Sequence, residues 1–139
     1  MTVRVEHVFE LDAPPSAVWD FIADPEKRAR PISVVERFEV TGDRTARWHV
    51  RLPIPFLDRT IPIDTEELER DEPRFVSFIG RSTALTVRGE HELEPTESGT
   101  RLRNRFVVDG KIPGVERFFE RQFDSELDNL ESAIKEALA

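Results

Sequence analysis

The residues that could do chemistry are polar side chains that interrupt apolar faces. From Val115 to Leu138 apolar residues recur every three or four positions, and Gln122 and Glu126 fall inside that apolar arc at about 100° per residue. Both side chains are therefore expected to point inward. Because a buried carboxylate is costly unless it is paired, Glu126 should either bond to a histidine or hold a proton.

Two histidines and one asparagine are the matching exceptions in segments that alternate with a period of two. His7, His91 and Asn104 share the phase of their apolar neighbours and should also face inward. An acid beside an imidazole can orient a ligand hydroxyl or carbonyl, act as general acid and base on a bound ketone, or form a structural pair. All three roles stay open, with Glu126, His91 and His7 as the candidate catalytic residues.

The composition excludes several kinds of site. With no cysteine among the 139 residues, disulfide scaffolds, thiol catalysis and cysteine-ligated metals are ruled out. His49 shares its phase with Arg47 and Arg51 and is expected to be exposed, so the three histidines do not make a metal site. We expect no metal and no cofactor. The net charge of -8 argues against a nucleic-acid partner.

The elements that must position these residues are mostly strands. Residues 3–12 alternate in polarity, and two short helices follow, over 16–23 and from 25 to Pro31. Turn-forming residues then separate segments 33–41, 45–52, 60–70, 74–81, 84–94 and 100–109, which predicts an antiparallel meander of about seven strands in all. The acidic run between Asp64 and Glu72 fits a solvated strand edge better than a cation site.

One long amphipathic helix is predicted to close the chain, over about 24 residues from Val115. A chain of this length suits one domain, 1–139, of the α+β class. No stretch approaches the roughly 20 apolar residues that span a bilayer. We therefore expect a cytoplasmic monomer without stable membrane insertion.

Two local motifs resemble a known superfamily. Residues 9–25, FELDAPPSAVWDFIADP, resemble the pattern in which the first strand of START and birch-pollen-allergen proteins (SRPBCC) ends in Ala-Pro and a Val-Trp pair opens the first helix. Residues 99–102, GTRL, resemble the turn before its last strand. The most similar branches are the polyketide cyclase/dehydrase-like proteins and those that resemble the G-type carbon monoxide dehydrogenase subunit. The chain departs from many relatives at Arg30-Pro31-Ile32, where those have a Trp-Pro pair.

The resemblance implies a helix-grip fold, in which the C-terminal helix crosses the concave face of a curved sheet. It also pairs the first strand with the last and the last with the one before it, so His7, Asn104 and His91 should cluster. The gap beneath the helix is either a ligand cavity or a densely packed core. The expected ligand-binding residues are His7, Phe9, Trp48, Val50, His91, Asn104, Phe106, Phe119, Gln122, Phe123, Glu126 and Leu130.

The loop after residue 52 is unusually apolar. Ile54, Phe56 and Leu57 are candidates for a lid over the cavity, a plug in the core or a contact for a partner. The leading functional hypothesis is binding of an apolar small molecule such as a lipid, polyketide, quinone or aromatic compound. The alternatives are a cyclase or dehydrase that uses Glu126 with an inward histidine, and a protein-binding accessory factor.

Overall fold

Seven antiparallel strands form one curved sheet in the order β1-β7-β6-β5-β4-β3-β2. The computed structural model describes residues 2–55 and 57–139. The strands are β1 (Thr2–Leu11), β2 (Val35–Val40), β3 (Thr45–Val50), β4 (Ile61–Asp71), β5 (Phe75–Arg81), β6 (Leu85–Pro95) and β7 (Thr100–Gly110). These are the seven strands that the alternation predicts, shortened by one or two residues at some ends.

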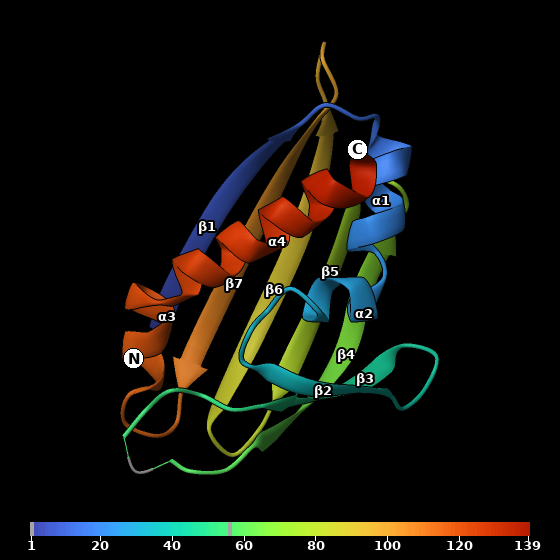
Figure 1. The fold of residues 1–139 in the computed structure, drawn as a ribbon. Coiled ribbons are helices and arrows are strands. Elements are labelled where there is room, and N and C mark those ends of the chain that lie inside the picture. Colours follow the sequence, from blue (N-terminus) through green and yellow to red (C-terminus); the bar gives the residue numbers. More distant parts are fainter. Residues whose placement is uncertain (1, 56) are drawn as a thin grey trace.

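Two short helices connect β1 to β2. Helix α1 (Pro15–Ile22) begins at a proline, whose missing N–H is one that the first helical turn leaves unused in any case. Helix α2 (Pro25–Ala29) begins after Asp24, whose carboxylate accepts from the backbone N–H groups of Glu26 and Lys27 at 2.9 and 3.4 Å. Both helices lie at one end of the sheet beside the C-terminus (Figure 1).

The C-terminal segment is two helices, so the prediction of one continuous helix was wrong. Helix α3 (Val115–Arg121) and helix α4 (Phe123–Leu138) meet at Gln122, where φ is -117°. In a straight helix Phe118 and Phe123 would lie about 140° apart around the axis. The break turns both rings inward, with their centroids 6.3 Å apart.

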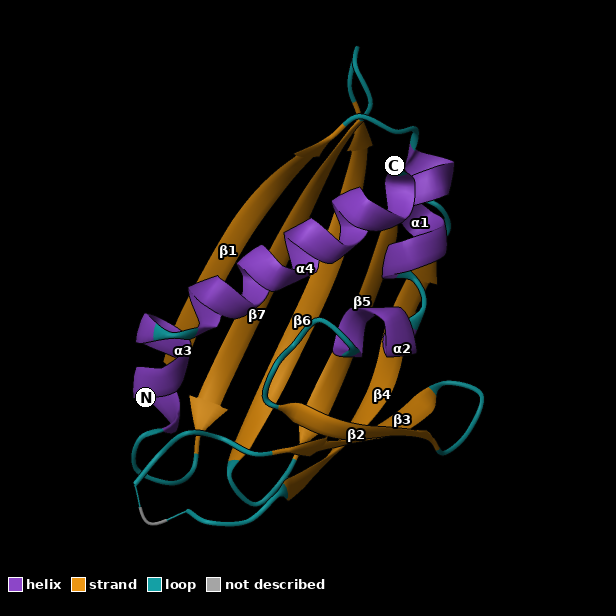
Figure 2. Cartoon of the chain, in the orientation of Figure 1, coloured by secondary structure: helices purple, strands orange, loops and turns teal. Residues whose placement is uncertain are grey.

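The helices cover one face of the sheet (Figure 2). Helix α4 runs diagonally across the concave face, from α3 near β1 and β7 toward α1, while β2 and β3 curl around the other end (Figure 1). Strand β7 alternates between buried and partly buried residues along most of its length, as expected for a sheet with one covered face. The predicted helix-grip architecture is confirmed.

Ion pairs cover the outer face of β1, β7 and β6. Arg105 contacts Glu6 on one neighbouring strand and Glu90 on the other, at 2.8 and 3.3 Å, and Arg101 bridges Glu10 and Glu94 in the same way. The predicted pairing of acid with base across this exposed face is therefore confirmed. Of the helices described, none combines the length and the apolar character needed to cross a membrane.

Candidate functional site

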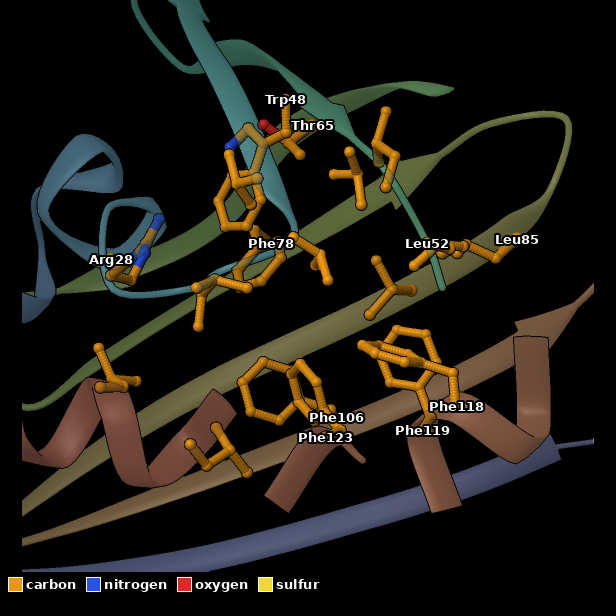
Figure 3. Close-up of a pocket in the computed structure, with 18 of the residues that line it drawn as sticks. Arg28, Trp48, Leu52, Thr65, Phe78, Leu85, Phe106, Phe118, Phe119 and Phe123 are labelled. Carbon is orange, nitrogen blue, oxygen red and sulfur yellow. The ribbon is translucent and has the colours of Figure 1, made fainter. Parts of the chain in front are cut away.

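A cavity lies between the C-terminal helices and the curved part of the sheet. Its volume is about 80 Å³, whereas one water molecule needs about 10–15 Å³ by the same measure. Phe106, Phe119 and Phe123 contact one another along one wall, with centroids 5.2 and 4.8 Å apart between neighbours. They do not fill the space that separates them from β3, β4 and β5, so the core is hollow there (Figure 3).

A glycine shapes the floor of this cavity. Gly89 on β6 lies in register with Phe78 on β5 and with Phe106 on β7. A Cβ atom at Gly89 would lie 2.5 Å from the Phe78 ring and 3.1 Å from the Phe106 ring. The missing side chain therefore lets two large rings from neighbouring strands lean toward each other over bare backbone.

The polar row on β1, β7 and β6 forms as the resemblance implies. Asn104 is the register partner of both His7 and His91. Its Nδ2 donates to the His7 carbonyl at 3.1 Å, which leaves Oδ1 to accept from Nδ1 of His91 at 2.7 Å. His91 is thus fixed as the Nδ1–H tautomer, and its Nε2 is the nitrogen that can accept a hydrogen bond.

The environment of His91 keeps its imidazole neutral. Burial, supported by the positive charge of Arg28, lowers the pKa of His91 to about 3. The ring is 1% exposed, lies parallel to Phe78 at 6.3 Å and meets Phe106 edge-on at 5.8 Å. His91 lines the cavity as an uncharged acceptor rather than as an acid or a strong base.

The predicted pair of Glu126 with a histidine does not form. Glu126 is buried as expected, but its carboxylate accepts from the Ser33 hydroxyl at 2.6 Å and from Asn129 Nδ2 at 3.3 Å. His7 instead contacts Asp124, with 2.9 Å between Nε2 and Oδ1. The direction of the Glu126 side chain was predictable, whereas Ser33 lies outside the regular elements and gave no periodic signal.

One cationic side chain lines the cavity, and sequence reasoning missed it. Arg28 on α2 is 6% exposed, and burial lowers its pKa to about 10, against an opposing effect of the Glu67 charge. Its Nη1 donates to the Ile22 carbonyl at 3.0 Å, and its guanidinium carbon lies 5.2 Å from the centroid of the Phe78 ring. A five-residue helix has too few turns to show an apolar phase, so Arg28 looked like a surface residue.

Two buried donors at this end of the cavity have no partner within the described chain. They are Nε of Arg28 and Nε1 of Trp48. Both side chains also line a second, more polar hollow beside the first, together with Thr65 and Phe78. The Phe78 ring joins the two donors, because it lies beneath Arg28 and 6.4 Å from the centroid of Trp48.

The structure brings only some of the predicted ligand-binding residues to the cavity. Those that line it are Trp48, Val50, His91, Phe106, Phe119, Phe123 and Leu130. His7, Phe9, Asn104, Gln122 and Glu126 do not line it. The C-terminal helices contact β1 and β7 directly, so the hollow lies farther along the sheet than predicted, and Gln122 is exposed at the break between helices.

The apolar loop packs against the core. Ile54 and Leu57 are partly buried against it and do not line the cavity, while Leu52 does. Ile54 lies beside Gly114, where φ is 97° and a Cβ atom would come within 3.1 Å of its side chain. Phe56, the third candidate lid residue, lies outside the described residues.

No group of three or more histidine or acidic side chains in the described ranges is arranged to hold a metal ion. The acidic run on β4 is partly occupied by arginines: Asp64 accepts from Arg47 at 2.7 Å, and Glu67 accepts from Arg44 at 3.3 Å and also from Arg70. Thr65 lines the cavity but donates to the Ala46 carbonyl at 3.1 Å. The polar groups left for a ligand are therefore the two donors and His91 Nε2.

Solved structures share this fold. A conserved protein from Geobacillus kaustophilus superposes with a TM-score of 0.80 at 14% identity, over 96% of this chain and 93% of the other. The Zhui aromatase/cyclase from Streptomyces sp. R1128 gives 0.76 at 17% identity, over 99% and 94%. A START superfamily protein from Mycobacterium smegmatis gives 0.77 at 14% identity, over 98% and 99%.

Sequence comparison extends the likeness from fold to family. A search of the curated proteins finds no match. A family profile, described as polyketide cyclase / dehydrase and lipid transport, matches residues 2–135. This match covers nearly the whole chain, and the chain belongs to the polyketide cyclase / dehydrase and lipid transport family.

Proposed function

We propose that the protein binds an apolar small molecule in the cavity between α3, α4 and the curved sheet. The observation that carries the proposal is the lining itself, which is aromatic and aliphatic apart from Arg28, Thr65, His91 and the indole N–H of Trp48. A dry apolar cavity of this kind gains free energy when an apolar ligand replaces empty space or poorly bonded water. The family description, which includes lipid transport, supports the same function.

The cyclase or dehydrase alternative receives less support from the site. It requires a carboxylate and an imidazole that exchange protons with a bound ketone, yet Glu126 is bonded to Ser33. The pKa of His91, lowered to about 3 by burial, makes it a weak base at neutral pH. No observation on the loop around Ile54 favours the accessory-factor alternative over packing against the core.

A cavity-filling variant tests the proposal. The neutral fluorophore N-phenyl-1-naphthylamine should bind to the natural protein with saturable enhancement of its emission. Val87→Phe puts a ring into the cavity and should weaken this binding about tenfold or more, whereas Val8→Phe makes the same change on a side chain that is 42% exposed and should leave it unchanged. Equal binding by all three proteins, with folding verified by thermal melting, would contradict the proposal.

Native mass spectrometry supplies an independent readout. Protein isolated gently from its own host should carry a small molecule that the Val8→Phe protein retains and the Val87→Phe protein has lost.

A further inference from the structure

The cavity has a charged end and an apolar end. Arg28 lies at one side, and Phe118 and Phe119 lie at the opposite side (Figure 3). Among the lining residues described, Arg28 is the one with a permanent charge. A ligand that fills the space therefore meets a cation at one end and aromatic rings at the other.

Arg28 lacks the carboxylate partner that a buried arginine normally has. Glu67 is close enough to affect its pKa, but Glu67 makes its ion pairs with Arg44, at 3.3 Å, and Arg70. Asp24, the other nearby acid, caps the first turn of α2. Within the described chain, Arg28 thus forms a bond to the Ile22 carbonyl and a contact with the Phe78 ring, but no ion pair.

The unused donors point to the missing group. Nε of Arg28 and Nε1 of Trp48 are both buried without a hydrogen-bond partner, and both residues contact Phe78 and line the same two hollows. Buried donors left unbonded cost about 1–3 kcal/mol each. A carboxylate satisfies two converging donors at once and neutralises the guanidinium, which an alcohol or a ketone cannot do.

We infer that the ligand is an apolar carboxylic acid, held with its carboxylate between Arg28 and Trp48 and its apolar body against Phe106, Phe118, Phe119 and Phe123. This inference rests on the proposed function and adds the chemical class of the ligand. Arg28 and Trp48 are then the residues that select an acid over a neutral molecule of the same shape.

Matched acids and alcohols test the inference. Octanoic acid is compared with 1-octanol, and 2-naphthoic acid with 2-naphthalenemethanol, by displacement of N-phenyl-1-naphthylamine at pH 7.5. In at least one pair the acid should bind about tenfold or more tightly than its alcohol, which corresponds to one charge-assisted hydrogen bond or more. The pair that shows the preference tells whether the apolar body is an alkyl chain or an aromatic ring system.

Variants assign the preference to its residues. Arg28→Met keeps the length of the side chain and should abolish the preference for the acid while alcohol affinity stays within about threefold. Trp48→Phe keeps a ring and should reduce the preference without abolishing it. Arg44→Met removes an equal charge nearby, from a residue that already has an ion pair with Glu67, and should leave the preference intact.

The two tryptophan indole N–H signals give a readout that does not depend on affinity. Trp19 already donates to Glu72 at 3.0 Å, so its NMR signal should stay in place when the acid binds. The Trp48 signal, identified by its loss in Trp48→Phe, should move downfield with the acid and not with the alcohol.

The possible failures are distinguishable. Alcohols that bind as tightly as acids in the natural protein, or a preference for acids that survives Arg28→Met, would overturn the inference while leaving the proposed function in place. Failure of all four probes and of the fluorophore would overturn both.

Discussion

His91 donates from Nδ1 to Oδ1 of Asn104 across the β6–β7 pair, with 2.7 Å between the two atoms. The amide cannot rotate without losing its second bond, from Nδ2 to the His7 carbonyl at 3.1 Å. One asparagine therefore ties three strands together and decides which nitrogen of His91 accepts from a ligand.

Asn104→Leu should lower the free energy of unfolding by about 2 kcal/mol, because it leaves the His91 Nδ1–H buried without an acceptor. Urea unfolding measures this effect. The double variant Asn104→Leu with His91→Phe removes both partners and should recover part of the loss. An Asn104→Leu protein as stable as the natural one would show that this bond contributes nothing.

Acid should destabilise the protein through His91. In the folded protein, burial and the Arg28 charge lower the pKa of His91 from 6.5 to about 3. Below about pH 6.5 the unfolded chain therefore binds a proton that the folded protein does not, so the free energy of unfolding falls as the pH falls. The loss between pH 6.5 and about pH 4.5 should be about 2 kcal/mol.

His91→Phe should flatten this part of the pH profile, measured by urea unfolding at each pH. Glu39 provides the contrast, since hydrogen bonds from His49 and Arg37 lower its pKa from 4.5 and its contribution is lost only at more acidic pH. Identical profiles for the natural protein and His91→Phe above pH 4.5 would contradict the assignment.

Arg28→Met should raise the free energy of unfolding by about 1–2 kcal/mol, even though it removes the bond to the Ile22 carbonyl. An unpaired buried charge is costly, and an apolar side chain of similar length avoids that cost. Thermal and urea unfolding of the ligand-free proteins measure the change. A marked loss of stability would mean that Arg28 is there to support α2.

Arg70→Met is the matched control for that change. Arg70 has an ion pair with Glu67, donates to the Ala23 carbonyl at 3.0 Å and lies 5.4 Å from the centroid of Trp19. The same substitution at this position should lower the free energy of unfolding.

Ser33→Ala should destabilise the protein by about 1–3 kcal/mol because it removes the donor nearest the buried Glu126 carboxylate. The affinity for N-phenyl-1-naphthylamine should stay unchanged, since neither residue lines the cavity. In a double-mutant cycle with Glu126→Gln, the two effects should be clearly non-additive. Additive effects on stability, or loss of fluorophore binding, would contradict a purely structural pair.

Gly89→Ala should lower the free energy of unfolding by about 1–3 kcal/mol and weaken fluorophore binding, because the new methyl group meets the Phe78 ring. Adding Phe78→Leu should restore part of the stability. Gly42→Ala is the control, since its nearest neighbour is the exposed hydroxyl of Thr45, which can move. Equal effects at the two glycines would show that the floor of the cavity tolerates a side chain.

The sequence predicts the fold well, because alternation and turn residues act locally. The strands, the Asp24 cap and the inward direction of Glu126 all follow from spacing along the chain. The site is harder to predict, because it depends on contacts between distant elements. Glu126 meets Ser33, 93 residues away along the chain, and Arg28 becomes buried only when α2 packs beside the curved sheet.

The predicted helix from Val115 to Leu138 shows a second limit. Apolar spacing continues through Gln122, so periodicity alone cannot reveal the change of direction there. What decides it is the packing of Phe118, Phe119 and Phe123, whose centroids all lie within 6.3 Å of one another.

The break at Gln122 also makes the roof of the cavity a jointed one. Phe118 and Phe119 belong to α3, whereas Phe123, Leu127 and Leu130 belong to α4, and all five line the same space. The angle between two rigid rods then sets the distance from the α3 rings to the sheet. Ligands of different lengths can be admitted by a change at this single joint, while the packing of α4 on β1 stays as it is.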